Sequence, residues 1–96
     1  MAGVAIFWAP TALEDLAALR ANYPASYPEV KSKALSRLEA VLGNLAVFPD
    51  MGRPGSIEGT REFAISGTPF VLVYRREPQR LVVLAVRDGR MDPQAQ

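Results

Sequence analysis

REFAISGTPFVLVYRREPQRLVVLAV, residues 61–86, is the stretch that decides the fold. Three segments within it, residues 61–65, 70–75 and 81–86, are rich in β-branched and aromatic residues, and short segments with proline, glycine or clustered charges separate them. This pattern is typical of strands joined by tight turns. The second and third segments are almost continuously apolar, which favours central positions in a sheet with at least partial cover on both faces. Residues 61–86 therefore predict an antiparallel meander of three strands.

Two helices are predicted ahead of the meander. Between Ser26 and Pro49 apolar residues recur at spacings of three and four, and most charged residues fall outside that stripe, as in an amphipathic helix. A shorter helix is predicted from Thr11 to Asn22, with Thr11 as its N-cap and Glu14 completing a capping box. Because only a short loop joins them, the two helices should form an antiparallel hairpin.

The remaining segments complete the expected architecture. Residues 4–8 are apolar and rich in strand formers, and they predict a first strand. Residues 50–59 contain three glycines and a proline, which predicts a loop from the helices to the sheet. The order strand, helix, helix, strand, strand, strand predicts an α+β fold in which a helical hairpin packs on a small, mainly antiparallel sheet. At this length we expect a single domain over residues 1–96.

The composition excludes several classes of function. The chain has no cysteine and no histidine, which excludes disulfide scaffolds, the common zinc sites and mechanisms that need a histidine base or a cysteine nucleophile. We therefore predict no metal and no cofactor. The first residues lack the basic region and long apolar core of a signal peptide, and no apolar stretch approaches the ~20 residues of a membrane helix. We expect a cytoplasmic protein without a membrane partner.

Positive and negative charges nearly balance over the whole chain, but lysine and arginine are unevenly distributed along it. The formal net charge of +1 predicts no strong direct binding of nucleic acid by the chain alone. All seven basic residues after Pro49 are arginines, which suit planar contact with phosphate or carboxylate. Arg76 and Arg80 flank a turn, where a solvated surface is the better explanation. The candidates for contact with a target or with a partner's carboxylates are Arg53, Arg61, Arg75, Arg87 and Arg90; solubility and protection of strand edges is the competing interpretation.

Four motifs in order resemble the RelE/ParE superfamily of toxin–antitoxin toxins. Residues 7–16 are similar to its opening strand followed by A-x-x-D-L, and residues 45–54 to its L-x-x-x-P-x-x-G-R-P passage. Residues 61–75 are similar to its R-x-h … Y-h-h-h-Y-R hairpin, where h is apolar. Residues 85–90 resemble the end of its last strand, except that relatives commonly carry a histidine there. The resemblance extends over residues 6–92.

The resemblance implies a bacterial toxin encoded beside an antitoxin, as in plasmid stabilisation systems. ParE-like members poison DNA gyrase, whereas RelE-like members cut mRNA on the ribosome. The passage Gly52-Arg53-Pro54 favours the ParE-like branch, which implies an inhibitor that acts by binding rather than an enzyme. The implied antitoxin has a DNA-binding half and a disordered half. The disordered half is expected to fold on the toxin and to cover apolar helix residues such as Leu19, Tyr23 and Tyr27.

Two alternatives stay open at this point. A RelE-like ribosome-dependent mRNA endoribonuclease would use Arg61, Arg75 and Arg87 to stabilise phosphate charge, and it would also need an acid and a base. Glu62 or Asp88 would be the base, although strand alternation turns Glu62 away from Arg61. The second alternative is a degenerate module that binds an antitoxin but has lost toxicity, which the missing histidine allows.

Three further residues are assigned structural roles. Trp8 and Tyr74 lie in predicted strands, and we assign them to the core rather than to a platform for stacking nucleobases. Asp15 lies near the start of the first predicted helix, where the helix dipole favours a carboxylate.

Overall fold

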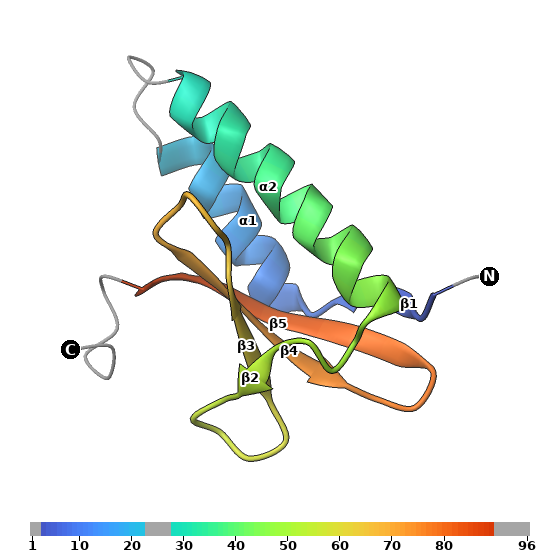
Figure 1. Cartoon of the computed structure of the whole chain (residues 1–96). Helices are drawn as coiled ribbons and strands as arrows, with labels where there is room; N and C mark the ends of the chain where they lie inside the picture. The colour runs from blue at the N-terminus through green and yellow to red at the C-terminus, as the bar shows by residue number, and fades with distance from the viewer. Residues whose placement is uncertain (1–2, 23–27, 90–96) are drawn as a thin grey trace.

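The computed structural model describes residues 3–22 and 28–89, and Arg90, Tyr23 and Tyr27 lie outside them. Two helices pack on one face of a five-stranded sheet, with β2 short and at the lower edge of Figure 1. This confirms the α+β class and the element order, with one added strand. The elements are β1 (Ala5–Trp8), α1 (Pro10–Asn22), α2 (Pro28–Val47), β2 (Arg53–Pro54), β3 (Arg61–Ala64), β4 (Phe70–Arg76) and β5 (Arg80–Asp88).

The strands lie in the order β1-β5-β4-β3-β2. Strand β1 runs parallel to β5, and the other neighbours are antiparallel, so the predicted meander of β3, β4 and β5 is confirmed. The two most apolar strands, β4 and β5, are flanked on both sides, as their composition indicated. In the described residues the helices cover one face only, yet Val73 on the other face is 9% exposed.

Strand β2 is a correction to the predicted loop. Arg53 pairs with Glu62 and Pro54 with Arg61, so the segment adds an edge strand to β3. The segment gave no strand signal because it is short, contains Pro54 and is flanked by Gly52 and Gly55. Proline is tolerated there because an edge strand need not donate on its outer side.

The start of α1 is also a correction. The helix begins at Pro10, and the carbonyl of Ala9 accepts hydrogen bonds from the amides of Ala12 and Leu13. Ala9 is fixed by its own amide, which donates to the carbonyl of Val83, so the helix starts at the residue after it. A proline in the first turn suits this start because its missing N–H would have no partner there. Thr11 is therefore inside the helix and not its N-cap.

The side chains of Thr11 and Asp15 both form hydrogen bonds with the backbone of strand β5. The pairing of β4 with β5 shifts register at Val73 and Tyr74, which leaves one extra residue, Leu84, in β5. The Thr11 hydroxyl donates to the carbonyl of Leu84 at 2.8 Å, and the Asp15 carboxylate accepts from the amide of Val86 at 3.0 Å. Asp15 is structural, as predicted, but it satisfies a strand edge that β1 is too short to reach rather than a helix dipole.

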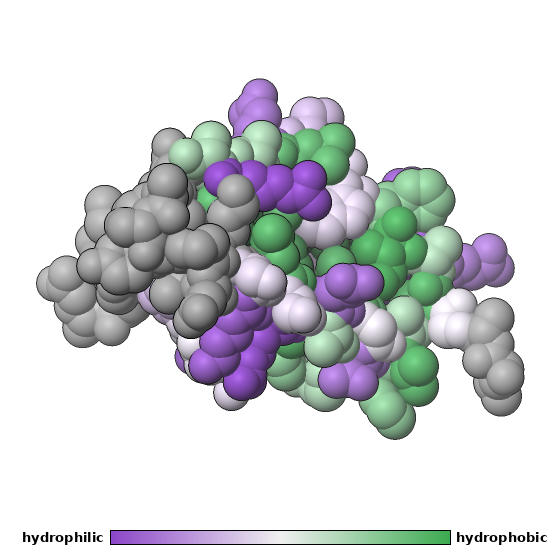
Figure 2. Space-filling view, turned by 90° about the horizontal axis from the view of Figure 1, so that it is seen from above, coloured by the Kyte–Doolittle hydropathy of each residue, from purple (hydrophilic) through white to green (hydrophobic). Residues whose placement is uncertain are grey.

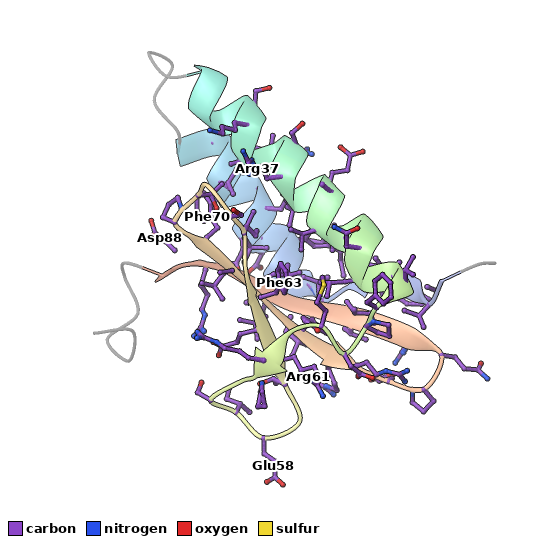
Figure 3. The ribbon with its side chains drawn as sticks, in the orientation of Figure 1. Arg37, Glu58, Arg61, Phe63, Phe70 and Asp88 are labelled. Atoms are coloured by element: carbon purple, nitrogen blue, oxygen red, sulfur yellow. The ribbon has the colours of Figure 1, made fainter. Side chains whose placement is uncertain are left out.

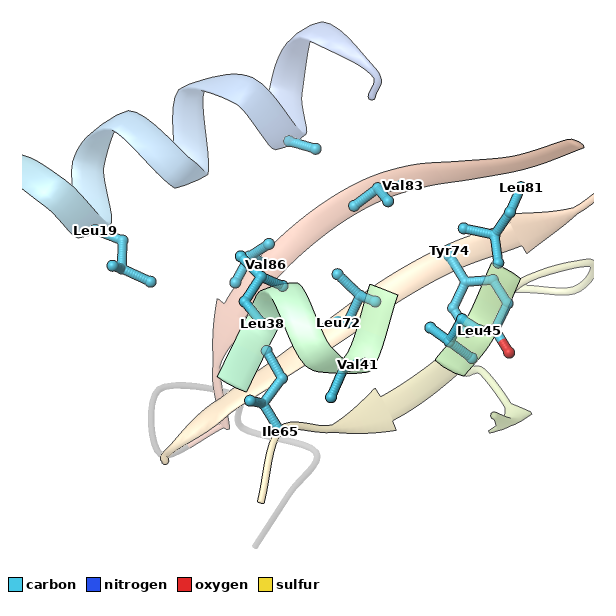
Figure 4. Close-up of a cluster of buried hydrophobic side chains, with 11 residues drawn as sticks. Leu19, Leu38, Val41, Leu45, Ile65, Leu72, Tyr74, Leu81, Val83 and Val86 are labelled. Carbon is cyan, nitrogen blue, oxygen red and sulfur yellow. The ribbon is translucent and has the colours of Figure 1, made fainter. Parts of the chain in front are cut away.

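The core lies between the two helices and the sheet (Figure 4). Tyr74 is fully buried and Trp8 packs against the cluster, which confirms both assignments. Leu19 is only 8% exposed, so the expectation that a partner covers it is wrong; it faces β5 and is already covered within the chain. The buried cluster consists of Ala12, Leu19, Leu38, Val41, Leu45, Ile65, Leu72, Tyr74, Leu81, Val83 and Val86.

The helical side keeps some apolar surface. Figure 2, viewed onto that side, shows apolar residues (green) interspersed with polar ones (purple). Leu13 and Val47 are 52% and 60% exposed. Neither helix, within the described ranges, combines the length and the apolarity needed to span a membrane.

Candidate functional site

Three of the predicted arginines meet on the face of the sheet that the helices leave open, which we call the helix-free face. Side chains alternate between the faces of a strand, so residues paired across strands share a face. Arg53 pairs with Glu62 and Glu62 with Val73, which puts Arg53 on the helix-free face. By the same register Arg87, paired with Val71, and Arg75, paired with Val82, lie on it too.

Glu62 holds two of these arginines. Its Oε1 lies 3.4 Å from Nη2 of Arg53, and its Oε2 lies 3.3 Å from Nη2 of Arg87. The Glu62 side chain is 11% exposed and also accepts a hydrogen bond from the amide of Ser56 at 3.3 Å. A largely buried carboxylate between two guanidiniums orients both of them on the sheet, Arg87 more firmly than Arg53, whose side chain is 75% exposed. As strand alternation predicted, Glu62 points away from Arg61.

Arg75 differs from the other arginines of this face. It is exposed, and no residue in the described part of the chain forms an ion pair or hydrogen bond with its guanidinium. Arg80, by contrast, pairs with Glu77 and lies 5.3 Å from the centre of the Phe7 ring. The guanidinium of Arg75 is therefore available to an external carboxylate or phosphate.

The helix-free face has an apolar centre. Val71, Val73, Val82 and Ala85 lie side by side on β4 and β5, and all are buried or half-buried. Phe7 adds an exposed ring on the β1 side. Around this centre stand Arg53, Arg75, Arg80 and Arg87; Glu62 pairs with Arg53 and Arg87, and Glu77 pairs with Arg80. An apolar centre with a predominantly cationic rim is suited to binding a protein surface.

Arg61 is not part of this face. It pairs with Tyr74, so it lies on the helical side, beside the loop that joins α2 to β2 (Figure 3). Its Nη1 donates to the carbonyls of Gly52 at 2.6 Å and of Asp50 at 3.2 Å, and its Nε lies 3.8 Å from the Asp50 carboxylate. In this position Arg61 fastens the loop to the sheet.

Tyr74 holds the same loop through hydrogen bonds of its hydroxyl group. Its hydroxyl donates to the carbonyl of Pro49 at 2.8 Å and accepts from the amide of Gly52 at 2.9 Å. Burial raises the pKa of Tyr74 above its ordinary value of 10.0, partly offset by the Gly52 hydrogen bond and the nearby charge of Arg61. The tyrosine is therefore a neutral structural residue at physiological pH.

The anchored loop forms a second feature that the sequence did not predict. A depression of about 540 Å³ is lined by residues 47–51 and Arg76. Arg76, assigned from sequence to a solvated turn, has its Nε 3.3 Å from the Asp50 carboxylate. The available sequence signal was Phe48 and Met51, two large apolar residues beside proline and glycine.

The structure does not bring the candidate acid–base groups together. The two candidate bases lie on opposite faces, because Asp88 pairs with Phe70 on the helical side (Figure 3) whereas Glu62 lies between Arg53 and Arg87. The hydroxyl of Tyr74 is committed to Pro49 on the helical side. No group of three or more carboxylates that could hold a metal ion occurs within the described ranges.

Comparisons with known proteins agree with this architecture. Residues 6–93 match the family described as "ParE toxin of type II toxin-antitoxin system, parDE". Toxin ParE3 of Caulobacter vibrioides is 37% identical over 70 residues, which are 71% of this chain and 68% of that protein. The protein Y4kP of Sinorhizobium fredii is 31% identical over 81 residues, 82% of this chain and 84% of the relative.

A solved structure confirms the fold. A chain of the structure described as "Chromosomal ParDE TA system from P. aeruginosa" superposes with a TM-score of 0.77 at 23% identity, over 88% of this chain and 95% of that one. The family match extends over most of the sequence and includes every described strand and helix except the first residue of β1. The chain belongs to the ParE toxin family of type II toxin–antitoxin systems.

Proposed function

We propose that this chain is a toxin that inhibits DNA gyrase by binding to it through the helix-free face. The observation that carries the proposal is the exposed, unpartnered Arg75 beside the apolar centre formed by Val73 and Val82. Inhibition by binding needs no reactive group, only a preorganised surface that matches the target. The pairing of Glu62 with Arg53 and Arg87 supplies that preorganisation.

Family membership supports the proposal that a cognate antitoxin neutralises this chain. A type II system pairs its toxin with a cognate antitoxin, and we propose that this antitoxin has a DNA-binding half and a half that folds on the toxin. The complex then represses its own operon through the antitoxin's DNA contacts. The toxin contributes no such contacts, since its net charge is only +1.

The proposal is tested by inducing the chain in a bacterial host and scoring growth, plasmid supercoiling and bulk mRNA together. Growth arrest with relaxed or broken DNA and intact mRNA is expected. Purified gyrase should lose supercoiling activity when the chain is added. Arrest with cleaved mRNA and normal supercoiling would replace this proposal with a ribosome-dependent endoribonuclease, and normal growth would leave a non-toxic module that binds an antitoxin.

A further inference from the structure

The depression at the end of α2 is rich in exposed apolar side chains. Six large apolar residues are exposed within the described ranges, and three of them, Val47, Phe48 and Met51, lie in one five-residue stretch with exposed fractions of 60%, 62% and 41%. They line the depression of about 540 Å³ together with Pro49, Asp50 and Arg76. A concentrated apolar patch with a polar rim is typical of an interaction site.

The apolar side chains are held outward by a fixed backbone. The amide of Phe48 donates to the carbonyl of Asn44 at 2.8 Å, and that of Met51 to the carbonyl of Phe48 at 3.1 Å. Tyr74 binds the loop at Pro49 and Gly52, as described above. Because the loop cannot fold its side chains inward without breaking these bonds, the patch is preorganised, which lowers the entropic cost of binding a partner.

Asp50 and Arg76 on the rim of the depression balance each other in charge, and Arg61, which lies beside Asp50 but outside this lining, adds a second positive charge. Oδ1 of Asp50 faces both Nε of Arg76 at 3.3 Å and Nε of Arg61 at 3.8 Å. One carboxylate thus serves two guanidiniums, and the Asp50 side chain is 65% exposed. Arg61, Arg76 and Asp50 also line an adjoining depression of about 330 Å³. A second copy of the chain is a poor occupant, because two rims of like net charge would face each other.

We propose that this depression, which we call the loop pocket, receives an apolar side chain of the cognate antitoxin together with an adjacent carboxylate of the same segment. The apolar side chain contacts Phe48 and Met51, and the carboxylate joins Asp50 at the guanidiniums of Arg61 and Arg76. The identity of the partner rests on the proposed function. The pocket lies away from the helix-free face, so the antitoxin has an anchor separate from the surface that contacts the target.

The chemistry of the pocket is tested first with small probes on the full chain. Amide chemical shifts of the ¹⁵N-labelled protein are followed by NMR while 4-phenylbutyrate is added, and separately 4-phenylbutylamine, which has the same apolar body and the opposite charge. Shifts should concentrate at residues 47–51 and Arg76, with the carboxylate bound about two- to fivefold more tightly than the amine, as expected for one exposed ion pair. Arg76→Gln should remove the difference. Equal binding of both probes, or shifts confined to other residues, would overturn the proposal.

The antitoxin is tested by co-expression with the gene that neighbours this toxin. Met51→Asp should still arrest growth but should no longer be rescued by the antitoxin, and its affinity for the purified antitoxin should fall at least about tenfold, as for a buried anchor at an interface. Ile57→Asp is the matched control, since it places the same charge at an exposed apolar residue outside the pocket. Full rescue of Met51→Asp, or an equal loss in both variants, counts against the pocket. If wild type does not arrest growth, the proposed function fails, while the affinity measurement still decides the pocket.

Discussion

Arg75 and Arg61 lie on neighbouring strands and have opposite surroundings. Arg75 has no partner among the described residues, whereas Arg61 donates to Gly52 and Asp50. From sequence alone, both arginines were candidates for contact with a target or with a partner's carboxylates. The structure therefore predicts different effects for substitution of these two arginines, because only the side chain of Arg61 forms hydrogen bonds within the described residues.

Arg75→Ala should weaken growth arrest and gyrase inhibition about tenfold or more and leave the melting temperature unchanged, because it removes one exposed interface arginine. Arg61→Ala should lower the free energy of unfolding by about 1–2 kcal/mol, because a charged hydrogen bond to the Gly52 carbonyl is lost. Thermal melts of both variants, with Lys33→Ala as a control that removes a positive charge from the exposed side of α2, check the pair. A fully toxic Arg75→Ala would exclude this arginine from the target contact.

Tyr74→Phe should destabilise the chain by about 1–3 kcal/mol, since the buried amide of Gly52 loses its acceptor. The effect should also depend on pH. Burial raises the folded-state pKa of Tyr74 above 10.0, so the folded chain holds the phenol proton more tightly than the unfolded chain. Its stabilisation is therefore complete below pH 10 and is lost as the pH rises through the folded-state pKa.

Urea titrations of wild type and Tyr74→Phe at neutral and alkaline pH measure this dependence. Wild type should lose stability above pH 10 more steeply than the variant, which has no phenol proton at this position. Identical slopes for the two proteins would mean that the buried hydroxyl does not resist ionisation.

At the scale of elements, Gly52 in the loop between α2 and β2 and Gly43 in helix α2 differ in the space around them. A Cβ at Gly52 would lie 2.6 Å from the Tyr74 hydroxyl and 3.0 Å from the Glu62 carbonyl, whereas a Cβ at Gly43 meets nothing within 4 Å. Gly52→Ala should therefore destabilise the chain by about 1–3 kcal/mol through crowding. Gly43→Ala should stabilise it by about 0.5–1 kcal/mol, because alanine favours the helix. Denaturation of both variants checks the contrast, and a neutral Gly52→Ala would show that the loop yields easily.

Helix α1 contributes side chains to the core and also forms hydrogen bonds with the sheet. Thr11 and Asp15 supply a donor and an acceptor to β5 beyond the point where β1 ends. A buried strand edge without such partners would leave polar backbone groups unsatisfied. The aspartate of the A-x-x-D-L motif, Asp15, therefore has a structural role in this chain. The two hydrogen bonds fix the position of helix α1 relative to the sheet.

At the scale of the whole molecule, the near-neutral net charge of +1 predicts weak binding of nucleic acid by the chain alone. The chain alone should bind a short DNA duplex with a Kd weaker than about 10⁻⁵ M at ~150 mM salt, because few phosphates can be neutralised at once. Fluorescence anisotropy of a labelled duplex measures this, with and without the antitoxin. Tight binding by the chain alone, falling steeply with salt, would contradict the assignment of all operator contacts to the antitoxin.

Across the whole molecule, local sequence patterns predicted some structural features correctly and others wrongly. The amphipathic stripe predicted for α2 is confirmed in its buried residues Ala34, Leu38, Val41 and Leu45, because helical spacing is a local property. The N-cap at Thr11 and the exposure of Leu19 were predicted wrongly, because each depends on contacts with β5, about 70 positions away in the chain. The partners of Arg53, Arg61 and Arg87 likewise come from other elements.

The sequence by itself determined both helices, the strands β1, β3, β4 and β5 and their order, since periods of 2 and 3.6 and the turn residues act within a few positions. Its motifs carried the resemblance to the family, whereas the short edge strand β2 depends on pairing with β3. Only the tertiary structure decided which arginines share a face. Counted by simple alternation, Arg87 has the parity of the buried Leu81 and Val83 and would point toward the helices. The extra residue Leu84 shifts that parity and places Arg87 beside Glu62 on the helix-free face. A bulge arises from the pairing of two strands, so no single strand's sequence specifies it.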